Sequence, residues 1–170
     1  MPRTKKVIRR YKEVCRAAIE AEEVAAPEPY TPPSKAQIAT IEESLGIRLP
    51  ADYLQFHAEC EGYQLPFWDL YVLTGDVDES EHLVEANRGH RRTPPHGVAL
   101  PEQLVAFFDD GTMTLHCFNT SERDKKGNYA IVTWDHETEE QDPDDLEIWA
   151  ESFTEWLEEQ IDEAEAELDA

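Results

Sequence analysis

The stretch "SLGIRLPADYLQFHAECEGYQL", residues 44–65, predicts two helices that meet at a short, fixed bridge. Gly46 favours the left-handed conformation that ends many helices. Pro50 suits the start of the next helix, because its missing N–H needs no partner there. Only residues 47–49 separate the two signals. A bridge this short implies that both helices dock on one surface at a set angle.

The sequence on either side supports two amphipathic helices. Ser34 and Gln37 have the spacing of a capping box, which predicts a first helix from residue 34 to about Leu45. The second helix is expected to run to about Cys60 and to stop at Gly62. The positions expected to face inward are Ile38, Ile41, Leu45, Tyr53, Leu54, Phe56 and His57.

The remaining chain carries strand and turn signals and ends in one more helix. We predict a strand over 67–73, a short helix over 78–88, a hairpin of 104–108 and 112–118 turning at Asp110-Gly111, a strand over 128–134, an extended segment over 146–150, and a helix from Ser152. Phe153, Trp156, Leu157, Gln160, Ile161, Ala164 and Leu168 form the inward stripe of that helix. The order predicts an α+β fold with a mostly antiparallel or mixed central sheet and helices packed on it.

Charge is distributed very unevenly along the 170 residues. The chain has 38 acidic and 15 basic residues, a net charge of −23. Residues 1–16 contain seven basic residues and one acidic residue, a net charge of +6, so residues 17–170 carry −29. No Lys or Arg follows Lys126. Such a field repels nucleic acid and attracts basic partners, although adaptation to high salt would also produce an acidic surface.

The basic N-terminal segment is also amphipathic. Val7, Ile8, Tyr11, Val14, Cys15, Ala18 and Ile19 recur at helical spacing. We therefore expect an appended helix over 1–26 that lies on the domain, a Pro-rich linker over 27–33, and a main domain over 34–170. A partner-binding or membrane-surface helix and a flexible tail are the alternatives. The acidic last helix is expected to lie beside the basic first helix, within one chain or across a homodimer.

A search for catalytic chemistry gives no candidate site. His116 and Cys117 are neighbours on a predicted strand, so they face opposite sides and cannot form a dyad. No His or Cys spacing matches a metal site, and there is no Gly-rich phosphate loop, so we expect no metal, no cofactor and no enzymatic activity. Three widely separated cysteines suit the reducing cytoplasm, and no apolar run is long enough to span a membrane.

The tryptophans and the acidic segment over 136–147 have two interpretations each. We expect Trp134 and Trp156 to pack in the core. Core packing is also the first expectation for Trp68 and Trp149, but both lie beside acidic residues, and an exposed tryptophan among carboxylates would anchor a basic protein. The segment 136–147 is either a solvated loop or a partner-binding edge.

Four motifs in order resemble the SUKH superfamily, which includes the yeast cell-wall synthesis regulator and many bacterial immunity proteins. They are "SKAQIATIEESLGIRLPADYLQFHAECEG" (34–62), "LVAFFDDGTMTLHCFNTS" (104–121), "YAIVTWDHETEE" (129–140) and "AESFTEWLEE" (150–159). The resemblance covers about residues 34–160 and leaves the first helix outside. Cys60-Glu61-Gly62 stands where the family usually has Asn-Gly. The resemblance implies two helices held rigidly against a sheet, and a non-catalytic protein-binding function.

Two functions remain open at this stage. The first is an immunity protein that neutralises a basic toxin domain, nucleases being one such class, through an acidic surface. The second is an intracellular scaffold or regulator with another protein partner. The predicted partner-binding residues are Asp109, Asp110, Asp142, Asp144, Asp145 and Glu147, with Trp68 and Trp149 as candidate anchors.

Overall fold

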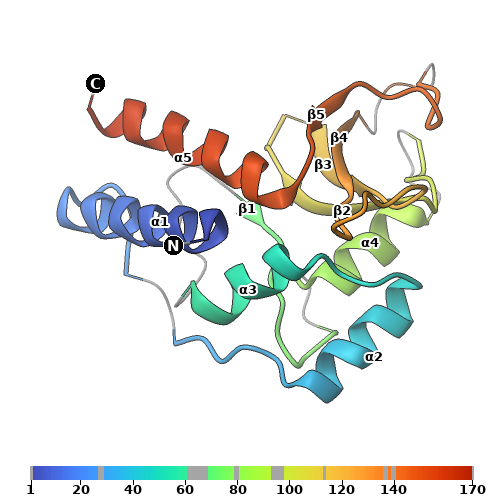
Figure 1. Ribbon diagram of the computed structural model, residues 1–170, viewed down its shortest axis with the longest axis horizontal. Coiled ribbons are helices and arrows are strands. Elements are labelled where there is room, and N and C mark those ends of the chain that lie inside the picture. Colours follow the sequence, from blue (N-terminus) through green and yellow to red (C-terminus); the bar gives the residue numbers. More distant parts are fainter. Residues whose placement is uncertain are drawn as a thin grey trace.

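Figure 1 shows the computed structural model, which describes residues 2–26, 29–60, 69–78, 81–92, 98–112, 114–135, 138 and 141–169. Its elements are, in chain order, α1 (Arg3–Glu20), α2 (Lys35–Leu45), α3 (Ala51–Glu59), β1 (Asp69–Leu70), α4 (Leu83–Arg91), β2 (Leu104–Asp109), β3 (Thr114–Asn119), β4 (Ala130–Asp135), β5 (Ile148–Ala150) and α5 (Phe153–Leu168). Helices precede and follow a group of strands, and the predicted α+β class is confirmed.

The strands form one antiparallel sheet in which each lies beside the next in sequence, in the order β1-β2-β3-β4-β5. A β-bulge between Ala106 and Phe108 interrupts the pairing of β2 with β3, and it lets Phe107 and Phe108 both join the larger core. Asn87 of α4 completes the hydrogen bonding of β2 there. Its side chain donates to the Ala106 carbonyl and accepts from the Ala106 N–H, both at 2.8 Å.

The sheet separates two apolar layers. The larger layer combines one face of the sheet with side chains from all five helices, including the fully buried rings of Tyr53, Phe107 and Trp156. The smaller layer, on the other face, consists of Leu100, Leu104, Ala106, Leu115, Cys117, Val132 and Trp134. Cys117 therefore lies on the face away from Trp156. Core packing of Trp134 and Trp156 is confirmed.

The bridge between α2 and α3 has the predicted geometry. Gly46 has a φ of +72° and ends α2 in the left-handed conformation, and the capping box at the start of α2 is present. The Glu42 carboxylate accepts a hydrogen bond from the Leu49 N–H at 2.7 Å, which fixes the end of the bridge. Pro50 is the N-cap of α3 and not its first helical residue, an offset of one position. Both helices contribute to the larger core.

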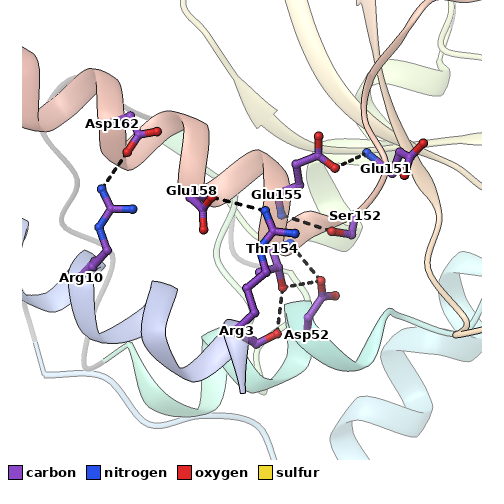
Figure 2. A network of polar contacts seen from close by, with 10 residues as sticks. Arg3, Arg10, Asp52, Glu151, Ser152, Thr154, Glu155, Glu158 and Asp162 are labelled. Atoms are coloured by element: carbon purple, nitrogen blue, oxygen red, sulfur yellow. Dashed lines mark hydrogen bonds and ion pairs between the residues drawn. The ribbon is translucent and has the colours of Figure 1, made fainter. Parts of the chain in front are cut away.

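The amphipathic segment at the start of the chain forms α1, which packs along α5 (Figure 1). Its buried residues are Val7, Ile8, Tyr11, Val14, Cys15 and Ala18. Arg3 pairs with Glu158, and Arg10 pairs with Asp162 at 2.7 Å (Figure 2). Arg10 also pairs with Glu165 at 3.2 Å. This register shows that the two helices run in the same direction. The prediction that the terminal helices lie together is confirmed within one chain.

The N-terminal ends of α1, α3 and α5 meet at Thr154 (Figure 2). Asp52 Oδ2 accepts hydrogen bonds from the Thr154 N–H at 2.9 Å and from its hydroxyl at 2.8 Å. The Thr4 and Thr154 hydroxyl oxygens lie 3.0 Å apart. A carboxylate is favoured there because the N-terminal ends of helices carry partial positive charge. These contacts join α1 to α3 and α5.

Two predicted elements differ from the structure. The prediction of a strand over 67–73 is wrong beyond Leu70, since only Asp69–Leu70 pairs with β2 and Val72 makes an isolated bridge with His82. Residues 67–68 and Gly62 lie outside the described residues. The helix predicted over 78–88 begins later, at Leu83, because the His82 imidazole caps it by accepting a hydrogen bond from the Val84 N–H.

Candidate partner-binding pocket

A pocket of about 310 Å³ opens beside the C-terminal half of α5. Its walls come from the end of β2, from β3, from β5 and from α5. The lining residues are Phe108, Asp110, His116, Trp149, Gln160, Glu163, Ala164 and Glu167. Three of them are carboxylates and none is Lys or Arg. This group of residues is termed the acidic pocket.

His116 lies at the base of the acidic pocket and is only 4% exposed. The indole N–H of Trp156 donates a hydrogen bond to His116 Nδ1 at 2.9 Å. Because an indole N–H can only donate, Nδ1 must hold a lone pair, and the hydrogen of the neutral ring is on Nε2. Asp110 Oδ2 lies 3.7 Å from Nε2, which is beyond hydrogen-bond distance.

The titration behaviour of His116 and Asp110 keeps the pocket negative. Burial lowers the pKa of His116, and the nearby carboxylates of Asp110 and Asp109 only partly offset this effect. The ring is therefore neutral at pH 7, and its contact with Asp110 is not a salt bridge. Partial burial alone would raise the pKa of Asp110, but hydrogen bonds from Thr112 and the presence of His116 lower it overall. Asp110 is accordingly ionised.

Gln160 is an unusual residue in the wall of the pocket. It is 5% exposed and occupies the inward stripe of α5. Its side-chain amide makes no hydrogen bond to any residue that the structure describes, and its polar atoms are not among the fully enclosed ones, so they reach the open space of the pocket. A polar group of this kind is poised for a ligand or water that enters the pocket.

The two flanks of α5 differ in how their carboxylates are paired. On the flank that faces α1, the carboxylates of Glu158 and Asp162 bind arginines (Figure 2), and Glu165 also binds Arg10. On the pocket flank, Glu163 and Glu167 are exposed and form no ion pair within the described part of the chain. The unpaired acidic surface of α5 is thus the one that faces the pocket.

β5 is an edge strand and carries two large apolar side chains at the surface. Ile148 is 58% exposed and Trp149 is 46% exposed. The Trp149 ring lies 5.2 Å from the His116 ring and forms one wall of the pocket. The expectation that Trp149 packs in the core is wrong, because β5 is the last strand of the sheet and no strand of the described residues covers it. Instead it is exposed between Glu147 and Glu151, which are also exposed.

The other predicted partner-binding residues lie in two places. Asp109 and Asp110 are at the C-terminal end of β2, whereas Asp144 accepts a hydrogen bond from Gln103, just before β2 begins. The six residues of β2 place roughly 20 Å between these positions. The residues of this second group, termed the acidic turn, are Asp142, Asp144, Asp145 and Glu147, and all are exposed. Trp68 lies outside the described residues.

Two buried cysteines and the acidic side chains of the described residues were candidates for reactive thiols and metal ligands. Burial raises the pKa of Cys15 to about 11 and also raises the pKa of Cys117, so both are unreactive thiols at neutral pH. Within the described ranges, no three His, Cys, Asp or Glu side chains are grouped to hold a metal ion.

Sequence reasoning missed four polar members of the pocket: His116, Gln160, Glu163 and Glu167. Gln160 did give a signal, because it is a polar residue within an otherwise apolar helical stripe. The other three could be recognised only once the packing of α5 against β3 was known.

The comparison with protein families agrees with this architecture. The model of the SMI1 / KNR4 family (SUKH-1) matches residues 32–159. The chain belongs to this family. SUKH-1 includes toxin immunity proteins that bind toxin partners. The match excludes α1 and ends just before Gln160, so the acidic pocket combines a SUKH-1 sheet with residues of α5 beyond the match.

Two further findings concern this SUKH-1 member. No curated protein matches the chain. Among the helices of the described residues, none is both long enough and apolar enough to cross a membrane.

Proposed function

We propose that this SUKH-1 member is an immunity protein that neutralises a basic toxin domain by binding it through an acidic surface. The surface consists of the acidic pocket, the exposed edge of β5 and the acidic turn. Membership of a family that includes toxin-binding immunity proteins supports a protein partner. Binding alone would suffice for neutralisation, so the function requires no catalytic group from this chain.

The observation that carries the proposal is the exposure of Trp149 beside unpaired carboxylates. Tryptophan is enriched among the residues that dominate the binding energy of interfaces, and it works best when the complex buries it completely. Trp149 is 46% exposed in the free protein and borders a pocket lined by Asp110, Glu163 and Glu167. An apolar anchor surrounded by negative charge fits a basic protein surface.

The charge distribution supports the same partner class. Residues 17–170 carry −29, and no Lys or Arg follows Lys126. Opposed charges speed association well above the ~10⁵–10⁶ M⁻¹s⁻¹ of neutral proteins, which suits an inhibitor that must act before its toxin does. An acidic surface of this kind would also fill the basic cleft of a nuclease as a mimic of the substrate phosphates.

A co-expression experiment tests the proposal. The product of the neighbouring reading frame is expressed in a sensitive host with and without this protein, and growth is measured. We expect the wild-type protein to restore growth. The variant Asp142→Lys/Asp144→Lys/Asp145→Lys and, separately, Trp149→Ala are expected to fold and to restore growth poorly.

The matched control for the lysine variant is Glu20→Lys/Glu22→Lys/Glu23→Lys. It makes the same change in net charge at exposed residues at the end of α1, away from the acidic turn (Figure 1). This control should restore growth like the wild type. Failure of the wild type to restore growth would contradict the immunity function. Full rescue by both site variants would contradict the proposed surface.

A further inference from the structure

The acidic pocket is concave and negatively charged. The Gln160 amide in its wall has no hydrogen-bond partner among the described residues. We propose that the acidic pocket receives an arginine side chain of the partner, with the guanidinium group held among Asp110, Glu163 and Glu167 against the ring of Trp149. This inference rests on the proposed binding function and names the chemical group that the pocket recognises.

The first argument is the Gln160 side chain. It is buried to 5% exposure, lines the pocket and makes no hydrogen bond with the described residues. Its amide oxygen can accept a hydrogen bond from a guanidinium N–H, as the carboxylates can. Unlike them, this acceptor lies in the wall of the pocket. An arginine with five N–H donors can bind this unpaired acceptor in the pocket wall and the exposed carboxylates at the same time.

The second argument is an internal precedent on the opposite flank of α5. There the Arg10 guanidinium bridges Asp162 and Glu165, which lie three residues apart on the helix. Figure 2 shows the contact with Asp162. Glu163 and Glu167 lie four residues apart on the pocket flank, and no Lys or Arg among the described residues pairs with them. Like charges at this spacing repel one another, so an incoming guanidinium would relieve an unfavourable contact as well as form new ones.

The third argument is the Trp149 ring beside the carboxylates. The half-exposed Trp149 ring offers a face for a planar cation, and tryptophan is the best aromatic partner for such contacts. Arginine stacks on aromatic faces and binds carboxylates through two N–H groups at once, whereas lysine is a compact point charge. The volume of about 310 Å³ is at the lower end of the ~300–1,000 Å³ of ligand pockets, which suits one side chain.

His116 acts as a positioning residue in this arrangement. The hydrogen bond from Trp156 fixes its lone pair on Nδ1, so the ring stays neutral and adds no positive charge to the pocket. Its Nε2–H faces Asp110 Oδ2 at 3.7 Å. Asp110 Oδ1 is already occupied by Thr112, which leaves Oδ2 to accept from the guanidinium.

A titration with a small probe tests the pocket without any toxin. N-acetyl-arginine methylamide is added to the isotopically labelled full chain, and the signals of the Gln160 side-chain amide and the Trp149 indole are followed by NMR. Binding is expected at roughly millimolar concentration, because one side chain buries few atoms. The citrulline analogue, which has the same shape and no charge, should produce far smaller shifts at equal concentration.

Three variants locate the binding site. Glu163→Gln/Glu167→Gln should weaken binding of the arginine probe about fivefold or more, as the loss of two charged contacts predicts. Gln160→Met should also weaken it, while its apolar side chain keeps the packing of α5. Glu43→Gln/Glu122→Gln removes two exposed carboxylates from α2 and from the loop before β4, and should bind the probe like the wild type.

The outcomes separate this inference from the proposed function. Equal shifts with arginine and citrulline probes, or equal weakening by the site and control variants, would overturn the arginine pocket. Saturable binding of the arginine probe that only the site variants weaken would support it. Such binding would support the arginine pocket even if the protein failed to restore growth. Restored growth without probe binding would support the immunity function and contradict the arginine pocket.

Discussion

The indole N–H of Trp156 donates a 2.9 Å hydrogen bond to Nδ1 of His116, and this bond joins the last helix to the middle of the sheet. Both residues are buried, and they come from α5 and β3. The bond fixes the tautomer of a histidine that lines the acidic pocket. A contact within the core therefore fixes the tautomer of a residue that lines a surface site.

Trp156→Phe tests this relationship. The substitution removes the only donor to His116 Nδ1 and leaves a buried acceptor unpaired, so we expect a loss of about 1–3 kcal/mol in the free energy of unfolding. It should also raise the pKa of His116, because an imidazolium N–H would no longer meet the indole N–H. Denaturant unfolding and an NMR titration of the histidines measure the two effects. An unchanged pKa would show that burial alone controls His116.

His57 predicts a pH dependence of stability. Burial lowers its pKa from 6.5 to about 3. The unfolded chain then binds a proton more readily than the folded chain between these values, so this group stabilises the fold fully above about pH 6.5 and progressively less as the pH falls toward 3. The integrated effect is about 3–5 kcal/mol.

His57→Phe isolates this contribution. A phenyl ring retains the aromatic contacts that His57 makes with Tyr53 and Phe56 but cannot titrate. Stability measured by urea unfolding from pH 7 to pH 4 should fall less steeply in the variant than in the wild type. Equal slopes for the two proteins would show that His57 is not the group responsible.

Gly46 predicts the cost of altering the bridge between α2 and α3. Its φ is +72°, and a Cβ at this position would meet no atom within 4 Å, so the cost of a side chain is backbone strain and not a clash. We expect Gly46→Val to lose about 1–3 kcal/mol of stability. Gly89→Ala is the matched control, because Gly89 lies within α4 with equally open surroundings and should gain about 0.5–1 kcal/mol.

Deletion of residues 1–26 tests the role of α1. Six residues of α1 are buried. Since each large apolar side chain contributes about 1.5–3 kcal/mol, the truncated chain should melt far below the wild type or fail to fold. Arg10→Gln removes only exposed ion pairs and should cost about 1 kcal/mol or less. A truncated chain that melts like the wild type would contradict the packing of α1 on α5.

The features that could be predicted from sequence depend on local signals. The left-handed Gly46, the capping box at Ser34 and the buried stripe of α1 each follow from residues within a few positions of one another. The opposite orientation of His116 and Cys117 follows from strand alternation alone. These signals fixed the fold class and most helices without knowledge of the tertiary structure.

The acidic pocket could not be predicted in the same way. It joins Asp110, His116, Trp149 and Gln160, which come from different segments of the chain. They meet only through the pairing of the strands and the packing of α5 on the sheet. The exposure of Trp149 follows from the position of β5 at the edge of the sheet. Neither the order of the strands nor the position at which a helix packs on the sheet can be predicted from a short window of sequence.

Hydrogen–deuterium exchange of the complex tests the central claim most directly. The partner used is the product of the neighbouring reading frame, which the proposed function expects to be a basic toxin domain, and exchange is compared with and without it. We predict slower exchange in 108–116, 141–151 and 157–167, and faster dissociation of the complex when Trp149→Ala is used. Protection confined to α2 and α3, with these three segments unchanged, would contradict the proposed binding surface.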